Sequence, residues 1–194
     1  ETENTNSGIK KILSVNNDKS TDSLEIIYDK TPFLYFLPET ERLFQASPST
    51  RRNFIDQFIY TTEHKYNKLV NRYNKFIQER SKILINNNYD ESWLNQLEKS
   101  ISADALQIYL LRESQITVLI NYLNTYLKDF YLPFTLDSKL IDKFYYSNIS
   151  HQDYETKLKD NRKIDSLVGG CRIGPHKSDY LFYVNNNSNV SQLS

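Results

Sequence analysis

A long stretch without proline or glycine constrains the fold of this chain more than any other feature. Ser47-Pro48-Ser49 combines a capping serine with a proline in the first turn, which is typical of a helix start. Residues 49–86 contain neither proline nor glycine, so the sequence predicts one or two helices there. The residues that recur on one helical face are Tyr66, Leu69, Val70, Tyr73, Phe76, Ile77 and Leu84.

A second long helix is predicted from Asp90, a typical N-cap residue, to about Phe130, before Pro133. Asn86-Asn87-Asn88 separates the two helical stretches. Two long helices with a short polar link predict an antiparallel helical hairpin, and we expect Trp93 to pack where they meet. Within the second helix, Asp104 and Gln115 interrupt a seven-residue apolar repeat. Its members are Leu94, Leu97, Ile101, Ile108, Leu111, Val118 and Tyr122.

Short extended segments flank the hairpin. On its N-terminal side, strands are predicted at 9–15, 23–28 and 32–38, with a turn at Asn16-Asn17-Asp18. On its C-terminal side, the sequence predicts a strand at 134–136, a polar helix over 150–165 capped by Ser150, and a strand at 180–184.

These elements predict an α+β fold, mostly α in this chain. We expect a strand-rich part at 1–46, a helical arm at 47–132, and a return to the strand-containing domain at 133–194.

Composition restricts the classes of function. The chain has 194 residues and balances 24 basic against 24 acidic residues, which argues against a wholly polybasic nucleic-acid binder but allows local basic patches. One cysteine permits no intramolecular disulfide, which fits a reducing cytosol. No apolar window approaches the length of a membrane span, so no membrane association is expected. Methionine is absent, so we expect this chain to be a piece of a longer protein.

Residues 169–180 hold three of the four glycines, together with Pro175, His176, Lys177 and Asp179. This concentration predicts a shaped loop leading into the strand at 180–184. No complete catalytic site is evident: there is no phosphate-binding glycine motif, and three scattered histidines with one cysteine give no metal-ligand spacing. A nucleophilic pair of Cys171 and His176 is disfavoured because no orienting acid accompanies it.

Basic residues form a candidate nucleic-acid contact. Between Arg51 and Lys82 there are eight Lys or Arg residues against three acids. Lys65, Lys68, Arg72 and Lys75 share one helical side. That alignment suits binding to a phosphate backbone. Alternatively, the four residues form a solvated face whose side-chain stems cover apolar surface.

The arginine pair at the start of this helix has two interpretations. Arg52 can pair locally with Asp56 one turn along the helix, or Arg51 and Arg52 can contact phosphate.

Together these motifs resemble the RecF family of bacterial DNA repair ATPases, which are SMC-like ABC proteins. Phe36-Leu37-Pro38-Glu39 and the segment from Ser47-Pro48 through Arg51-Arg52-Asn53-Phe54-Ile55-Asp56 are similar to two family motifs, although Thr40 and Glu41 depart from the pattern. Tyr66, Leu69, Tyr73-Asn74, Gln78-Glu79-Arg80 and Trp93 follow the family's helical arm, with Ser81 differing. Gly174-Pro175-His176-Lys177-Ser178-Asp179 resembles its G-P-H-R-D-D motif, with Lys and Ser at two positions. Leu193-Ser194 resembles the start of the ABC signature.

The resemblance implies a portion of an ABC-type P-loop ATPase head with an inserted helical-hairpin arm. In such a protein, ATP and Mg²⁺ join two protomers into a clamp around DNA, and hydrolysis releases it. It further implies binding at single-strand gaps, recombinase loading, a role in the SOS response, RecR and RecO as partners, and a bacterial cytoplasmic, nucleoid-associated location. Family members are slow ATPases; without a P-loop or Walker B motif, this chain alone is expected to bind no ATP and to be inactive.

The resemblance also implies residue roles. Ser194 would be the signature serine that contacts ATP in trans, and Glu39 would lie near the nucleotide metal. Gly174, Pro175, His176, Lys177 and Asp179 would form the approach to the signature helix, with His176 and Lys177 either positioning it or lying near phosphate. Arg51, Arg52, Lys65, Lys68, Arg72 and Lys75 are the DNA-binding candidates. The competing hypothesis is a non-enzymatic helical-hairpin interaction module that uses the heptad face.

Overall fold

The computed structural model describes residues 2–5, 8–11, 18, 34, 38–86, 90–130, 133–185 and 188–192. The chain forms two compact units, Glu1–Tyr35 and Phe36–Ser194. In the first unit, β1 (Thr2–Thr5) pairs with β2 (Gly8–Lys11) as an antiparallel hairpin. The predicted strand at 23–28 lies outside the described residues, as does most of the one at 32–38. Pro38 itself begins a 3₁₀ helix, η1 (Pro38–Gln45).

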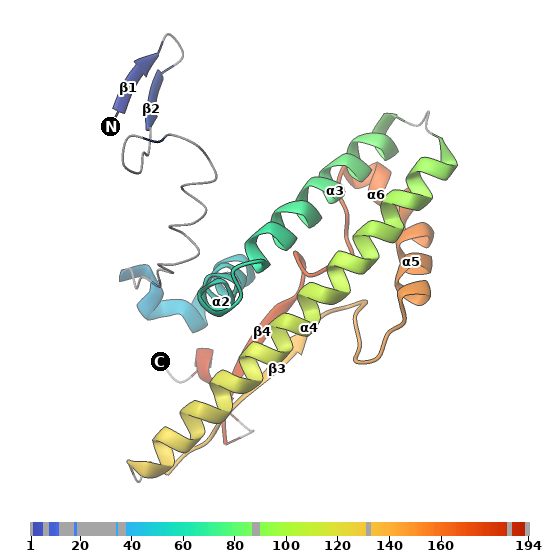
Figure 1. The fold of residues 1–194 in the computed structure, drawn as a ribbon. Helices are drawn as coiled ribbons and strands as arrows, with labels where there is room; N and C mark the ends of the chain where they lie inside the picture. The colour runs from blue at the N-terminus through green and yellow to red at the C-terminus, as the bar shows by residue number, and fades with distance from the viewer. Residues whose placement is uncertain are drawn as a thin grey trace. The chain divides into compact units, whose positions relative to one another are not determined.

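Three helices dominate the second unit, as the sequence predicted: α2 (Pro48–Thr62), α3 (Tyr66–Asn86) and α4 (Glu91–Asp129). The predicted caps are confirmed. Ser47 Oγ accepts from the Thr50 backbone N (3.3 Å), and Asp90 Oδ1 accepts from the Ser92 backbone N (2.7 Å). Figure 1 shows α3 and α4 side by side as the predicted antiparallel hairpin.

A three-stranded antiparallel sheet in the order β3-β4-β5 packs against α2 and α4. The strands are β3 (Leu136–Ile141), β4 (Asp179–Val184) and β5 (Ser188–Asn189). Leu136 pairs with Val184 and Ile141 with Asp179. The strand predicted at 134–136 was misplaced: only its last residue is in β3, because pairing with the distant β4 carries the strand on to Ile141.

The predicted polar helix at 150–165 is two helices, α5 (His151–Asp160) and α6 (Arg162–Val168), which pack on α4 and α3 respectively. Its predicted cap is confirmed, since Ser150 Oγ accepts from the Asp153 backbone N. A short 3₁₀ turn, η2 (Val190–Gln192), follows β5. None of the described helices is long and apolar enough to cross a membrane.

The core does not follow the predicted seven-residue repeat along all of α4. Val118 and Tyr122 are 60% and 69% exposed, whereas Ile116 and Ile120 are buried. A straight α-helix drifts by roughly 20° per heptad, so over several heptads the buried face leaves the repeat. The expectation for Trp93 was also wrong. It is 55% exposed, because its neighbour Leu94 occupies the inward position on that turn.

Candidate nucleic-acid interface

The 174–179 loop lies against α2, α3 and α4, and its first residue must be glycine. Gly174 has a φ of 135°, and a Cβ atom there would lie 2.0 Å from Tyr73 Oη on α3. Few residues other than glycine adopt this backbone conformation. The close approach therefore explains one of the glycines that marked this loop in the sequence.

An ion pair ties the end of the loop to the start of α2. Arg51 donates from Nε and Nη2 to the two carboxylate oxygens of Asp179, at 2.8 and 2.7 Å. Its Nη1 donates to the backbone oxygens of Phe44 and Ala46, so the side chain also holds the chain before α2. Arg51 is only 8% exposed. Of the predicted DNA-binding residues it is therefore the one that the structure places inside the protein.

A second arginine holds the middle of the loop. Arg112 on α4 makes a bidentate pair with Asp56 on α2, at 2.8 and 2.9 Å. Its Nη1 donates to the backbone oxygen of Pro175 (2.7 Å), and Tyr66 Oη donates to Asp56 (2.6 Å). Burial alone would lower the pKa of Arg112, but Asp56 beside it raises that pKa, so the guanidinium stays charged. Asp56 therefore pairs across helices, and not with Arg52 one turn away.

His176 connects the loop to α3 as a neutral side chain. Its Nε2 lies 2.9 Å from the backbone oxygen of Cys171, and its Nδ1 lies 2.7 Å from Tyr73 Oη. Since a carbonyl only accepts, Nε2 carries the proton and Nδ1 accepts from the tyrosine. Burial lowers the pKa of His176 to about 4, and the nearby cations Lys177, Arg52 and Arg112 contribute to this shift.

Cys171 is a core residue. It is buried, its Sγ donates to the backbone oxygen of Ile173 (3.1 Å), and burial raises its pKa to about 11. A thiol with this pKa is protonated at neutral pH, whereas the thiolate is the reactive form. His176 contacts the backbone of Cys171, so the geometry gives no support to a nucleophilic pair.

A pocket of about 200 Å³ opens where α2, α3, α4 and the loop meet. Arg52 lines it and donates from Nη1 to the backbone oxygen of Ser178 (2.5 Å). Burial lowers the pKa of Arg52, and the neighbouring Arg112 lowers it further. The other lining residues are Asn53, Asp56, Val70, Tyr73, Asn74, Ile108, Arg112, Pro175 and His176.

The predicted basic face is exposed on α3 and on the turn just before it. It consists of Lys65, Lys68, Arg72 and Lys75. Arg72 also has a structural contact, because its guanidinium pairs with Asp104 on α4 at 2.6 and 2.8 Å. Lys177 is exposed in the loop, apart from the helix that carries the basic face.

The two predicted nucleotide contacts remain predictions. Ser194 lies outside the described residues, and Glu39 lies in η1 with its side chain likewise outside them. Among the described residues, no group of three His, Cys, Asp or Glu side chains could hold a metal ion.

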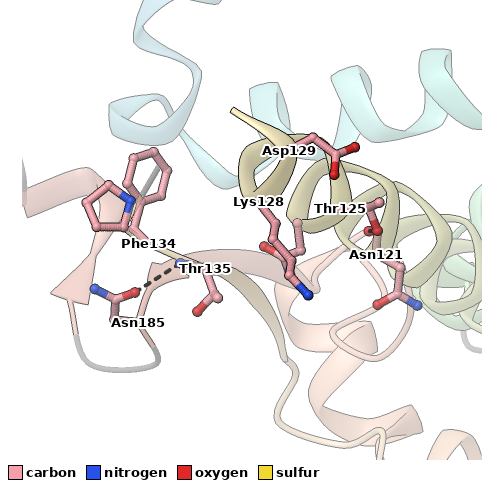
Figure 2. Close-up of a pocket in the computed structure, with 9 residues that line it drawn as sticks. Asn121, Thr125, Lys128, Asp129, Phe134, Thr135 and Asn185 are labelled. Atoms are coloured by element: carbon pink, nitrogen blue, oxygen red, sulfur yellow. Dashed lines mark hydrogen bonds between the residues drawn. The ribbon is translucent and has the colours of Figure 1, made fainter. Parts of the chain in front are cut away.

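A larger and more open pocket lies where α4 ends, between α4 and the residues next to β3 and β4 (Figure 2). The asparagine side chains that line it form hydrogen bonds with the backbone. Asn185 Oδ1 accepts from the Thr135 backbone N (2.9 Å), and Asn124 bonds both backbone groups of Leu136. Lys128 and Asp129 bring opposite charges to its wall, so the pocket shows no preference for an anion or a cation.

Sequence reasoning missed two buried arginines that organise the fold. Arg112 lies on the i,i+4 line between Ile108 and Ile116, and a charge on an apolar face was the available signal. Arg80 is fully buried and pairs with Glu98 and Asp165 at 2.9 and 2.7 Å. Its partners come from distant elements, so its sequence neighbours do not reveal them.

Comparison with known proteins gives a consistent result. No family model matches the chain. In sequence it is 27% identical over 157 residues to the DNA replication and repair protein RecF of Rickettsia bellii, covering 78% of this chain and 42% of that protein. It is 29% identical over 182 residues to RecF of Clostridium perfringens, covering 91% of this chain and 49% of that one. The chain therefore spans less than half the length of these curated relatives.

Solved structures agree in fold. The structure of the recombination mediator protein RecF with ATP, from the RecFOR pathway, superposes with a TM-score of 0.79 at 20% identity, covering 97% of this chain and 51% of that one. A second RecF structure, also of the RecFOR pathway, gives 0.78 at 19% identity, covering 94% and 51%. The fold class expected from the sequence, part of a RecF-type ABC ATPase with a helical hairpin, is confirmed. The resemblance to RecF inferred from the motifs is thus confirmed as well: in sequence and in fold, this chain is similar to about half of a RecF protein.

Proposed function

We propose that this chain is part of a RecF-like DNA repair protein. The observation that carries the proposal is the agreement between sequence similarity to RecF over 78–91% of the chain and the RecF fold over 94–97% of it. The finer proposal is an ATP-dependent dimeric clamp on DNA at single-strand gaps that promotes recombinase loading, with ATP and Mg²⁺ as cofactors and RecR and RecO as partners. In it, residues 1–46 and 133–194 belong to the ATPase head and 47–132 to the arm.

The contacts of the 174–179 loop support a mechanical role in such a clamp. Asp179 is bonded to Arg51 on α2, Pro175 to Arg112 on α4, and His176 to Tyr73 on α3. A displacement of the loop would disturb all three helices, because each contact is a directional hydrogen bond to a buried or half-buried side chain. In this proposal the loop couples nucleotide-dependent movement in the head to the arm.

The exposed basic face supplies the DNA contact. Phosphate groups on DNA attract aligned Lys and Arg side chains, and each neutralised phosphate adds about 0.9 to the slope of log affinity against log salt concentration. Lys65 and Lys75 are suitable test positions, because both are exposed and the structure shows no ion pair for either among the described residues.

The test compares two double charge reversals in the full-length protein with ATP present. Lys65→Glu with Lys75→Glu is expected to weaken DNA binding and to flatten the salt dependence by about two phosphate contacts, measured by fluorescence anisotropy at several salt concentrations. Lys99→Glu with Lys163→Glu makes the same change in net charge at exposed positions outside the basic face and serves as the matched control. Equal salt slopes for both variants and the unmodified protein would assign the basic face to solvation alone.

A protein-interaction module is the second candidate function. It is favoured by a line of exposed apolar side chains at i,i+4 spacing along α4: Val118, Tyr122, Tyr126 and Phe130. An exposed apolar line of this kind can pack against a partner helix. DNA binding that does not depend on the basic face, together with loss of a protein partner in a Val118→Ser, Tyr122→Ser variant, would favour this candidate.

A further inference from the structure

We propose that the pocket between α2, α3, α4 and the 174–179 loop binds a single phosphate group of a nucleic-acid backbone, with Arg52 as its charged ligand. This inference rests on the proposed DNA-binding function and adds to it a specific contact outside the basic face of α3. The pocket volume, about 200 Å³, suits one phosphate group. It is below the roughly 300–1,000 Å³ typical of pockets that take whole drug-sized molecules.

The charges around the pocket leave one guanidinium without a carboxylate. Arg51 pairs with Asp179 and Arg112 pairs with Asp56, each through two hydrogen bonds. Among the described residues, no carboxylate lies within ion-pair distance of Arg52. The cluster therefore has one surplus positive charge, and the exposed Lys177, whose charge acts on the pocket residue His176, adds another. A buried or half-buried surplus charge favours an anionic ligand, because a counter-charge stabilises it.

Hydrogen-bond donors at the pocket match a phosphate. Arg52 makes one hydrogen bond within the described part of the chain, from Nη1 to Ser178 O, so that Nε and Nη2 are available to a ligand. A guanidinium presents its donors in a planar fork that fits phosphate oxygens. Asn53 and Asn74, both exposed, bring side-chain amides to the same pocket. Arginine and asparagine are among the usual contacts of a DNA phosphate.

The potential at the pocket is positive by the response of its own groups. Burial lowers the pKa of Arg52 most, and Arg112 and Arg51 lower it further, while Asp179 and Asp56 act in the opposite direction without reversing the shift. Lys177, Arg52 and Arg112 likewise contribute to the lowered pKa of His176. The same surplus of positive charge that disfavours another bound proton attracts an anion.

A line of exposed amides connects the pocket to the basic face. At about 100° per residue, Asn67, Asn71 and Asn74 lie between Val70 at the pocket and Lys75 on the basic face. A backbone that places one phosphate in the pocket would then run across hydrogen-bond donors to the lysines. The geometry thus makes the pocket one end of a continuous phosphate path.

The principal experiment measures DNA affinity of the protein against salt concentration for Arg52→Gln and Arg52→Lys. Arg52→Gln is expected to lower the salt slope by about 0.9, the loss of one phosphate contact, while Arg52→Lys keeps most of the slope because it keeps the charge. A second variant, Asn74→Asp, leaves Arg52 and the loop intact and is expected to weaken binding by about tenfold, since it places a negative charge beside the phosphate. Asn121→Asp on α4 makes the same substitution at an exposed position outside the pocket and should bind as the unmodified protein does.

The outcomes separate this inference from the proposed function. Unchanged slopes for Arg52→Gln and unchanged affinity for Asn74→Asp, beside a flattened slope for the Lys65/Lys75 reversal, would overturn the phosphate pocket and leave the DNA-binding function standing. If Arg52→Gln unfolds the protein, Asn74→Asp decides. A titration of the full-length protein, which contains this chain, with ATP in the absence of DNA gives the remaining arm. Loss of ATP affinity in Arg52→Gln with unchanged DNA affinity would assign the pocket to a nucleotide phosphate and overturn the backbone contact.

Discussion

Single residues in the 174–179 loop have roles that follow from their surroundings. The Tyr73 hydroxyl occupies the space that a side chain at position 174 would need, and the same hydroxyl donates to His176. One tyrosine therefore requires both the glycine and the neutral histidine. These requirements make the loop a sensitive place to test the structure by substitution.

Replacing Gly174 by alanine should destabilise the protein by about 3 kcal/mol. The new methyl group meets Tyr73 Oη at 2.0 Å, and the φ of 135° strains any side chain. Gly170→Ala is the matched control, because a Cβ there meets no atom within 4 Å, and it should change stability by less than about 1 kcal/mol. Urea unfolding measures both, and equal free energies of unfolding for the two variants would contradict the loop geometry.

His176 should make stability depend on pH between about 4 and 6.5. Its pKa is about 4 in the folded protein against 6.5 in the unfolded chain, so the unfolded state binds the proton more readily in this window. The contribution of His176 to the free energy of unfolding is therefore fully present above pH 6.5 and decreases as the pH falls. The contribution lost between pH 7 and pH 5 is about 2 kcal/mol.

The measurement is the free energy of unfolding at pH 7 and pH 5 for the protein and for His176→Gln. His64 and His151 are present in both proteins, so the difference between the two proteins isolates His176. If the free energy of unfolding of His176→Gln decreased between pH 7 and pH 5 as much as that of the unmodified protein, folding would not lower the pKa of His176.

Between elements, a buried charge network joins α3, α4 and α6. Arg80 on α3 donates to Glu98 on α4 and to Asp165 on α6, and Arg162 on α6 also donates to Glu98. Arg80 and Glu98 have fully buried side chains. Since a buried charge that loses its partner is costly, the network fixes how these helices pack.

Glu98→Gln should therefore cost about 3 kcal/mol in the free energy of unfolding, because it leaves the buried Arg80 guanidinium with less compensation. Glu91→Gln makes the same change in the same helix on a residue that also pairs with Arg162, but the Glu91 side chain is 65% exposed. An exposed pair contributes about 0–1 kcal/mol. Thermal or urea unfolding of the two variants gives the comparison, and equal effects would exclude a structural role of the buried network.

At the scale of the whole molecule, the features that could be predicted from the sequence are those set by residues close together in the chain. Ser47, Asp90 and Ser150 marked helix starts because a cap bonds within its own first turn. The partners of Arg80 and Arg112, and the extent of β3, depend on residues far along the chain, so local patterns could not supply them. The basic face was predicted from helical spacing, whereas the pocket at Arg52 required the docked loop.

The Arg51–Asp179 pair joins positions that are 128 residues apart. A ribosome therefore completes α2 and the whole α3–α4 hairpin before Asp179 exists to meet Arg51. Until then Arg51 at the start of α2 lacks its carboxylate partner from β4, and α2, α3 and α4 cannot pack against the loop. We therefore expect this region to complete its folding late in synthesis, and a nascent chain that stops before residue 179 to be prone to degradation.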